Sequence, residues 1–397
     1  MKEKGISKVG AQSGHFLMAV PDSVIMFYSY IFPCLDPKRG GEAEDSLHGE
    51  SSSGHWPSSP GPSPTAGRFH DSPLRTPPSP LRAPLSPYRL NLSPQQSRKE
   101  PLNITLSQIY KITQNFSKDH MIGEGGFGSV YKAELSNGQT VAIKRGKKEK
   151  FGALRAEFRN EVALLTQIEH KNLVQLLGYI DEANEQLIIT EYVPNGTLRE
   201  HLDGARGGIL KFSQRLGIAI DIAHGLTYLH NYAEKPIIHR DVKSSNIMLT
   251  NTLRAKVADF GFARTGPTKE GQSHVSTNIK GTAGYVDPDY LRTFHLSPKS
   301  DVFSFGILLL EIISGRRPVE ITRAKEEKIT IRWAFSKYDE GYNREILDPE
   351  LHEEVPDEAL RRILSLAFQC AAPYRRDRPN MREVCEQLWK IRKDYNA

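Results

Sequence analysis

The sequence predicts an α+β protein in which a strand-rich segment precedes a long helical segment. Between residues 116 and 190, short apolar strands alternate with turn signals, among them the hairpin signal Ser136-Asn137-Gly138. Beyond these strands, apolar residues recur at helical spacing in the segments 216–232, 300–313 and 360–389. Runs of strands followed by runs of helices are typical of α+β folds.

The composition is that of a soluble protein with a disordered part. Of 397 residues, 38% are hydrophobic and 25% are charged, which allows a sizeable core. The three cysteines, Cys34, Cys370 and Cys385, lack metal-ligand spacing and indicate neither a disulfide framework nor a zinc site. This cysteine usage fits a reducing cytosol.

The net charge of +6 is not spread evenly along the chain. Residues 1–115 hold 12 basic and 9 acidic residues, or +3, which leaves +3 for residues 116–397. The segment 144–159 alone holds seven basic and two acidic residues, or +5. A nucleic-acid-binding protein more often has a broad basic face with interleaved aromatic residues, so we expect no nucleic-acid partner.

The first 115 residues divide into three segments. Residues 1–35 have apolar stretches of at most twelve residues, too short for a bilayer-spanning helix of about 20. Lys2 in place of glycine argues against myristoylation, whereas Cys34 is a candidate for palmitoylation, so we expect at most peripheral membrane contact. Residues 36–102 are rich in Ser and Pro and are predicted to be a disordered tail, and residues 103–115 a linker helix.

The predicted tail contains Ser-Pro and Thr-Pro pairs, which are either sites for a proline-directed kinase or a consequence of composition. They begin at Ser59, Ser63, Ser72, Thr76, Ser79, Ser86 and Ser93.

Residues 238–249 place a carboxylate, an ammonium and an amide within one short turn. Asp241 can accept the proton of an attacking hydroxyl, Lys243 can neutralise a moving phosphoryl group, and Asn246 can offer an oxygen to Mg²⁺. In isolation such a turn is better explained as a solvated loop with a salt bridge.

Three further motifs give this turn its context. A glycine-rich run at 123–130 is followed by Val-Ala-Ile-Lys at 141–144, and Asp-Phe-Gly at 259–261 comes downstream of the turn. Their order and spacing match the protein-kinase signature set, so residues 116–395 resemble a eukaryotic protein kinase. The resemblance implies a bilobal fold: a small β-rich lobe with one main helix at 116–190, a hinge at 191–195 and a large, mostly helical lobe at 196–395.

The resemblance implies Mg-ATP as the nucleotide. Lys144 would position the α and β phosphates and pair with Glu161 on the amphipathic helix 151–167, while Asn246 and Asp259 would hold Mg²⁺. Thr190 would be the gatekeeper before the hinge, and glycine-loop amides would meet phosphate oxygens. The nucleotide-binding residues implied are Ile122, Gly123, Glu124, Gly125, Gly126, Phe127, Gly128, Ser129, Val130, Ala142, Lys144, Thr190, Glu191, Val193, Met248 and Asp259.

Lys243 two residues after Asp241, with Gly-Thr-Ala-Gly-Tyr at 281–285, resembles the serine/threonine class. Other short motifs, such as Asp-Val-Phe-Ser-Phe-Gly at 301–306, resemble those of plant receptor-like kinases. The sequence shows no ectodomain or spanning helix, so it is most similar to receptor-like cytoplasmic kinases. The motif Leu-Ile-Ile-Thr-Glu-Tyr at 187–192 resembles that of their calmodulin-binding subgroup.

Calmodulin is also suggested by one helix. Phe151, Leu154 and Phe158 have the i, i+3, i+7 spacing of a calmodulin target and are flanked by basic residues. The alternative is that these residues only pack inside the small lobe.

We therefore expect a cytoplasmic serine/threonine signalling kinase, with at most peripheral contact at the plasma membrane, that acts on protein substrates under an upstream receptor. The alternatives are a catalytically weak kinase-fold scaffold and a membrane receptor kinase lacking its ectodomain.

Asp287-Pro288-Asp289 stands where kinases usually have Ala-Pro-Glu, and we expect Asp289 to reach Arg378. Arg240 suggests control by a phosphate on the activation segment, with Ser276, Thr277 and Thr282 as candidates. Thr282 is expected to contact Asp241 instead.

Overall fold

The computed structural model describes residues 102, 104–125, 128–147, 151–182, 185–267 and 273–396, with the backbone alone for 151–154. The segments predicted at 1–35 and 36–102 lie outside the described residues, apart from Leu102. Gly126 and Phe127 of the glycine-rich loop also lie outside them, as do the side chains of Phe151 and Leu154.

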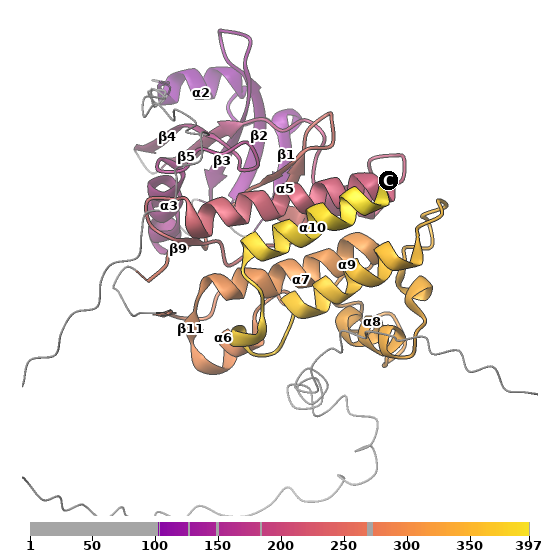
Figure 1. Ribbon diagram of the computed structural model, residues 1–397. Coiled ribbons are helices and arrows are strands. Elements are labelled where there is room, and N and C mark those ends of the chain that lie inside the picture. Colours follow the sequence, from indigo (N-terminus) through magenta and orange to yellow (C-terminus); the bar gives the residue numbers. More distant parts are fainter. Residues whose placement is uncertain are drawn as a thin grey trace, which may run out of the picture. The chain divides into compact units, whose positions relative to one another are not determined.

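A five-stranded antiparallel sheet forms the first lobe, with strand order β1-β2-β3-β5-β4 (Figure 1). Its strands are β1 (Met121–Glu124), β2 (Gly128–Glu134), β3 (Thr140–Gly146), β4 (Leu176–Glu182) and β5 (Glu185–Glu191). The predicted hairpin joins β2 and β3, and Gly138 has φ +81° at its turn, a conformation that favours glycine. The hairpin sets Val130 opposite Lys144, so the glycine-rich strand lies beside the strand that carries the lysine.

Helix α2 (Leu106–Ile112) packs against this sheet through Ile109, which is fully buried. Thr105 caps its start with a capping box formed with Gln108. The helix is shorter than the predicted 103–115 because Gln114, Asn115 and Phe116 all have positive φ, which ends the helical path.

Helix α3 (Phe151–Leu165) also packs on the sheet of this lobe, and it ends two residues before the predicted limit. Phe158, Val162 and Leu165 are buried, as their helical spacing predicts. The helix contacts β3, β4 and β5, which places Glu161 over the strand that carries Lys144.

The second lobe is helical. Its helices are α4 (Leu198–Leu202), α5 (Phe212–Asn231), α6 (Pro288–Thr293), α7 (Pro298–Ser314), α8 (Thr330–Asp339), α9 (Asp357–Cys370) and α10 (Met381–Tyr395). Helix α7 is buried along its whole length from Ser300 to Ser314 and contacts α5 and α9, with α10 packed on α5 and α9 (Figure 1). An all-round apolar helix is typical of a domain centre. Within the described ranges, no helix combines the length and apolarity that a bilayer span requires.

Three short antiparallel pairs were not predicted, because two- or three-residue strands leave no periodic signal. They are β6 (Ile237–Ile238) with β9 (Arg264–Thr265), β7 (Ile247–Leu249) with β8 (Ala255–Val257), and β10 (Val275–Ser276) with β11 (His295–Leu296).

The predicted pairing of Asp289 with Arg378 is wrong. The buried Arg378 guanidinium instead donates to Asp287 Oδ1 at 2.6 Å and to the carbonyls of Ala372, Pro373 and Lys299. Asp289 lies in the first turn of α6, where Arg292 donates to it at 2.7 Å. Asp287 is the N-cap of α6 and points into the lobe, so the first aspartate of the pair reaches the buried arginine.

Arg378→Ala should lower the free energy of unfolding by about 3–5 kcal/mol, because Asp287 would remain buried without its cation. Urea unfolding of the full chain measures this. Arg376→Ala is the control, since its side chain is 82% exposed and it should cost under about 0.5 kcal/mol. Equal losses for the two variants would contradict the assignment.

Candidate active site

A cleft with a volume of about 640 Å³ lies between the sheet and the loops of the helical lobe. Thirteen of the predicted nucleotide residues line it: Ile122, Gly123, Glu124, Gly125, Gly128, Val130, Ala142, Lys144, Thr190, Glu191, Val193, Met248 and Asp259. Ser129 is not among the lining residues; it lies on β2 opposite Arg145 of β3. Gly126 and Phe127 belong to the undescribed part of the loop.

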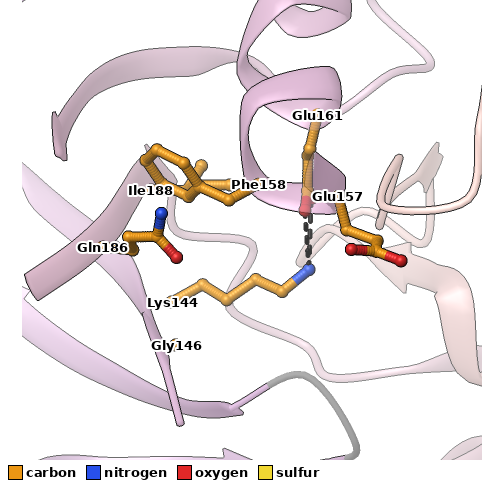
Figure 2. Close-up of a pocket in the computed structure, with 7 residues that line it drawn as sticks. All are labelled: Lys144, Gly146, Glu157, Phe158, Glu161, Gln186 and Ile188. Carbon is orange, nitrogen blue, oxygen red and sulfur yellow. Dashed lines mark hydrogen bonds and ion pairs between the residues drawn. The ribbon is translucent and has the colours of Figure 1, made fainter. Parts of the chain in front are cut away.

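Lys144 is the charged centre of this cleft. Its Nζ donates to Glu161 Oε2 at 2.9 Å and to Asp259 Oδ1 at 2.8 Å, so it joins α3 to the Asp-Phe-Gly segment. Figure 2 shows the Lys144 side chain extending toward Glu161. The predicted contact between Lys144 and Glu161 is present, and the contact with Asp259 adds a second carboxylate.

The three charges depend on one another. Burial opposes the charge on Lys144, but the carboxylates of Glu161 and Asp259 outweigh burial and raise its pKa well above the usual value. Burial raises the pKa of Glu161, with Lys144 acting in the opposite direction. Burial acts to raise the pKa of Asp259, but the charge and the hydrogen bond of Lys144 outweigh burial and lower this pKa. One ammonium therefore opposes the effect of burial on both carboxylates, and it outweighs that effect at Asp259.

The turn between β6 and β7 brings its polar groups onto one aspartate. Asp241 Oδ2 lies 2.7 Å from Lys243 Nζ and accepts from Asn246 Nδ2 at 3.0 Å. Asp241 Oδ1 accepts from Thr282 Oγ1 at 2.5 Å, and Lys243 Nζ donates to the same hydroxyl at 2.8 Å. The expected contact between Thr282 and Asp241 is thus present, and the activation segment is fixed to this turn.

A buried carboxylate that the sequence analysis overlooked holds the turn in place. Asp301 on α7 accepts from the backbone N–H groups of His239 and Arg240, each at 2.8 Å, and contacts His230 Nε2 at 2.8 Å. Arg240 has φ +69°, a costly conformation for a non-glycine residue that these bonds hold in place. An acid in a predominantly apolar helix was the available signal, because buried acids are almost always paired.

Arg240 is engaged by neutral groups. Its Nη2 donates to the Asn278 carbonyl and to the Tyr290 hydroxyl, each at 2.6 Å, and its Nη1 donates to the Phe262 carbonyl at 3.3 Å. These bonds tie the activation segment to the catalytic turn without a phosphate. Control by a phosphate on Ser276 or Thr277 stays a prediction.

Two oxygen atoms suit a magnesium ion. Asn246 uses its Nδ2 as a donor to Asp241, which leaves Oδ1 as the ligand atom. Asp259 engages Lys144 through Oδ1, which leaves Oδ2. Amide and carboxylate oxygens are the ligands that Mg²⁺ prefers, and both residues line the nucleotide-sized cleft, so they fit the ion.

A family profile described as protein tyrosine and serine/threonine kinase matches residues 116–388. The chain belongs to this family. Calmodulin-binding receptor-like cytoplasmic kinase 3 of Arabidopsis thaliana is 56% identical over 397 residues, covering 100% of this kinase and 78% of the relative. Kinases 2 and 1 of the same name and organism are 52% identical over 302 residues and 51% identical over 296 residues. They match 75% and 74% of this kinase, and 73% and 63% of their own lengths.

The kinase is therefore a serine/threonine protein kinase of the receptor-like cytoplasmic group, as its motifs predicted. Its bilobal fold class is likewise confirmed by the family match. Several further residues line the cleft that were not predicted as site residues, because most of them lie outside the signature motifs and the others, Ser245 and Phe260, carry no charge that points to nucleotide chemistry. The further residues are Leu165, Val174, Ile188, Tyr192, Thr197, Arg199, Glu200, Ser245, Ala258 and Phe260.

Lys144→Met should destabilise the kinase more at about pH 8 than at about pH 5. Without the ammonium, the folded-state pKa values of Glu161 and Asp259 should rise. A carboxyl group with a raised folded-state pKa costs stability above that pKa, and the cost disappears as the pH falls and the group is protonated.

We expect a deficit of about 3–5 kcal/mol at the higher pH, measured by urea unfolding, and a smaller one at the lower pH. Lys147→Met is the control, because Lys147 pairs at 3.2 Å with the exposed Glu124 and should cost under about 1 kcal/mol. A Lys144→Met deficit that grows on acidification would contradict the coupling.

Proposed function

We propose that this serine/threonine kinase uses Mg-ATP and transfers the γ-phosphoryl group to hydroxyls of protein substrates. The transfer would take place beside Asp241. The observation that carries this proposal is the convergence of Asp241, Lys243 and Asn246 beside the cleft that contains Lys144 and Asp259. Phosphoryl transfer depends mainly on positioning and on charges aimed at the phosphates, which is what this arrangement provides.

Each residue has a role set by its surroundings. Lys144, held by Glu161, would contact the α and β phosphates, and Asn246 with Asp259 would hold Mg²⁺, which supplies positive charge to the phosphates when bound. Asp241 would orient the substrate hydroxyl and accept its proton, and Lys243 would neutralise charge on the moving group. Thr282 keeps the carboxylate of Asp241 oriented.

Asp241→Asn should lower kcat by about 10²–10⁴-fold, because the amide keeps the size of the carboxylate but cannot accept the proton. Autophosphorylation and phosphorylation of a serine- and threonine-containing protein measure the rate. Asp339→Asn is the control, since Asp339 ends α8 and is exposed. Undiminished activity of Asp241→Asn would contradict the role of the aspartate and favour a scaffold.

We further propose that calmodulin binds the segment around α3. The Arabidopsis relatives are named as calmodulin-binding, and Arg155 and Arg159 expose 48% and 61% of their side chains on this helix. Phe158 and Val162 are buried in the kinase core, so calmodulin can grip them only if α3 moves away from the sheet. Such binding would compete with the contact between Lys144 and Glu161 and so change activity.

Arg155→Glu/Arg159→Glu should weaken calcium-dependent retention of the kinase on calmodulin beads by at least about tenfold, because basic residues flank the apolar anchors of calmodulin targets. Pull-downs with calcium and with chelator measure this. Arg361→Glu/Arg362→Glu on α9 is the control, since these two helical arginines expose 42% and 30% of their side chains and lie far from α3 in the sequence. Equal retention of both double variants would place calmodulin elsewhere.

The remaining proposals concern location and upstream partners. We propose that the kinase acts in the cytoplasm, with peripheral contact at the plasma membrane through the segment that contains Cys34. An upstream receptor and a proline-directed kinase that modifies the Ser-Pro pairs of residues 36–102 are proposed partners.

A further inference from the structure

We propose that Lys280 is a positioning residue that connects the activation segment to α3 and thereby maintains the contact between Glu161 and Lys144. The proposal rests on the function proposed above for Lys144. It assigns to the activation segment a direct mechanical link to the small lobe that requires no phosphate.

The link is an ion pair between residues 123 positions apart. Lys280 Nζ donates to Glu157 Oε1 at 2.6 Å, and the two side chains are 35% and 20% exposed. Glu157 lies on α3 one turn before Glu161. The ion pair with Lys280 therefore restrains the helix that carries Glu161. Lys280 also lies over the ring of Phe262, at 5.3 Å from its centroid.

A second contact ties the same face of α3 to the segment after Asp-Phe-Gly. Asn160 Nδ2 donates to the Ala263 carbonyl at 2.8 Å. Glu157 and Asn160 are three residues apart and therefore adjacent on the helix surface. Two neighbouring turns of α3 are thus held by two parts of the activation segment.

The other end of the link is the catalytic turn. Thr282 lies two residues after Lys280 and bonds both Asp241 and Lys243. Residues 280–282 therefore contact α3 at one end and the catalytic aspartate at the other. Their backbone couples the position of α3 to the position of the phosphate-transfer site.

The surroundings of Glu157 make its charge dependent on Lys280. Glu157 Oε2 is buried and has no hydrogen-bond partner among the described residues. Glu157 also lines a small cavity of about 30 Å³ with Lys144, Phe158 and Glu161 (Figure 2), a volume sufficient for a water molecule. Burial opposes the charge on Glu157, yet the bond from Lys280 lowers its pKa. Without Lys280, a half-desolvated carboxylate would remain beside α3, which favours movement of the helix.

The test compares Lys280→Met with Lys337→Met in the full chain after phosphatase treatment. Lys337 is a matched control, because it forms an ion pair of the same 2.6 Å length with Glu345 in the helical lobe. We expect Lys280→Met to lower kcat about 5- to 20-fold and to speed hydrogen exchange of the amides of 155–165, with Lys337→Met near wild type. The charge swap Lys280→Glu/Glu157→Lys should restore most of both losses.

A double-mutant cycle separates positioning from general destabilisation. In a Glu161→Gln background, Lys280→Met should lower kcat less than twofold, because the contact that it maintains is already weakened. Fully additive losses, or a Lys280→Met variant with wild-type kcat and hydrogen exchange, would overturn the proposal. The proposed function has its own test, since it fails only if Asp241→Asn retains activity.

Discussion

The catalytic turn depends on one buried carboxylate. Asp301 lies in the fully buried helix α7 and accepts two successive backbone N–H groups, those of His239 and Arg240. Burial opposes its ionisation, but the hydrogen bond and charge of His230 lower its pKa, so it stays an acceptor. Helix α7 is a rigid support because it is packed on several sides. Its Asp301 fixes the backbone of Arg240, the residue with positive φ that precedes Asp241.

Around this support, each lobe contributes one half of the site. The helical lobe fixes Asp241, Lys243 and Asn246, whereas the sheet fixes Lys144 by its register against Val130 and Ile188. The two halves meet through ion pairs and hydrogen bonds whose partners come from different elements. Such contacts have two discrete arrangements, made or broken, and are therefore suitable points of regulation.

Part of this arrangement could be predicted from the sequence. The contact between Lys144 and Glu161 follows from the signature motifs and from the helical spacing of 151–167, and the contact between Thr282 and Asp241 follows from the family resemblance. The role of Asp301 in holding the turn could not be predicted in the same way, because the groups that it holds there are backbone N–H groups, which almost any residue carries. The length of α2 was also overestimated, since left-handed conformations at 114–116 leave no periodic signal.

The sequence by itself determined the family, the order of the motifs and the main helices and strands, because residue type and apolar spacing are local properties. Only the tertiary structure decided which acidic side chain pairs with which basic side chain. Asp287 and Asp289 are two positions apart, yet only Asp287 faces Arg378, which lies 91 residues downstream. Lys280 and Glu157 are even further apart in the sequence, at 123 positions. Such pairings depend on how packed elements orient their side chains, and no local pattern contains that information.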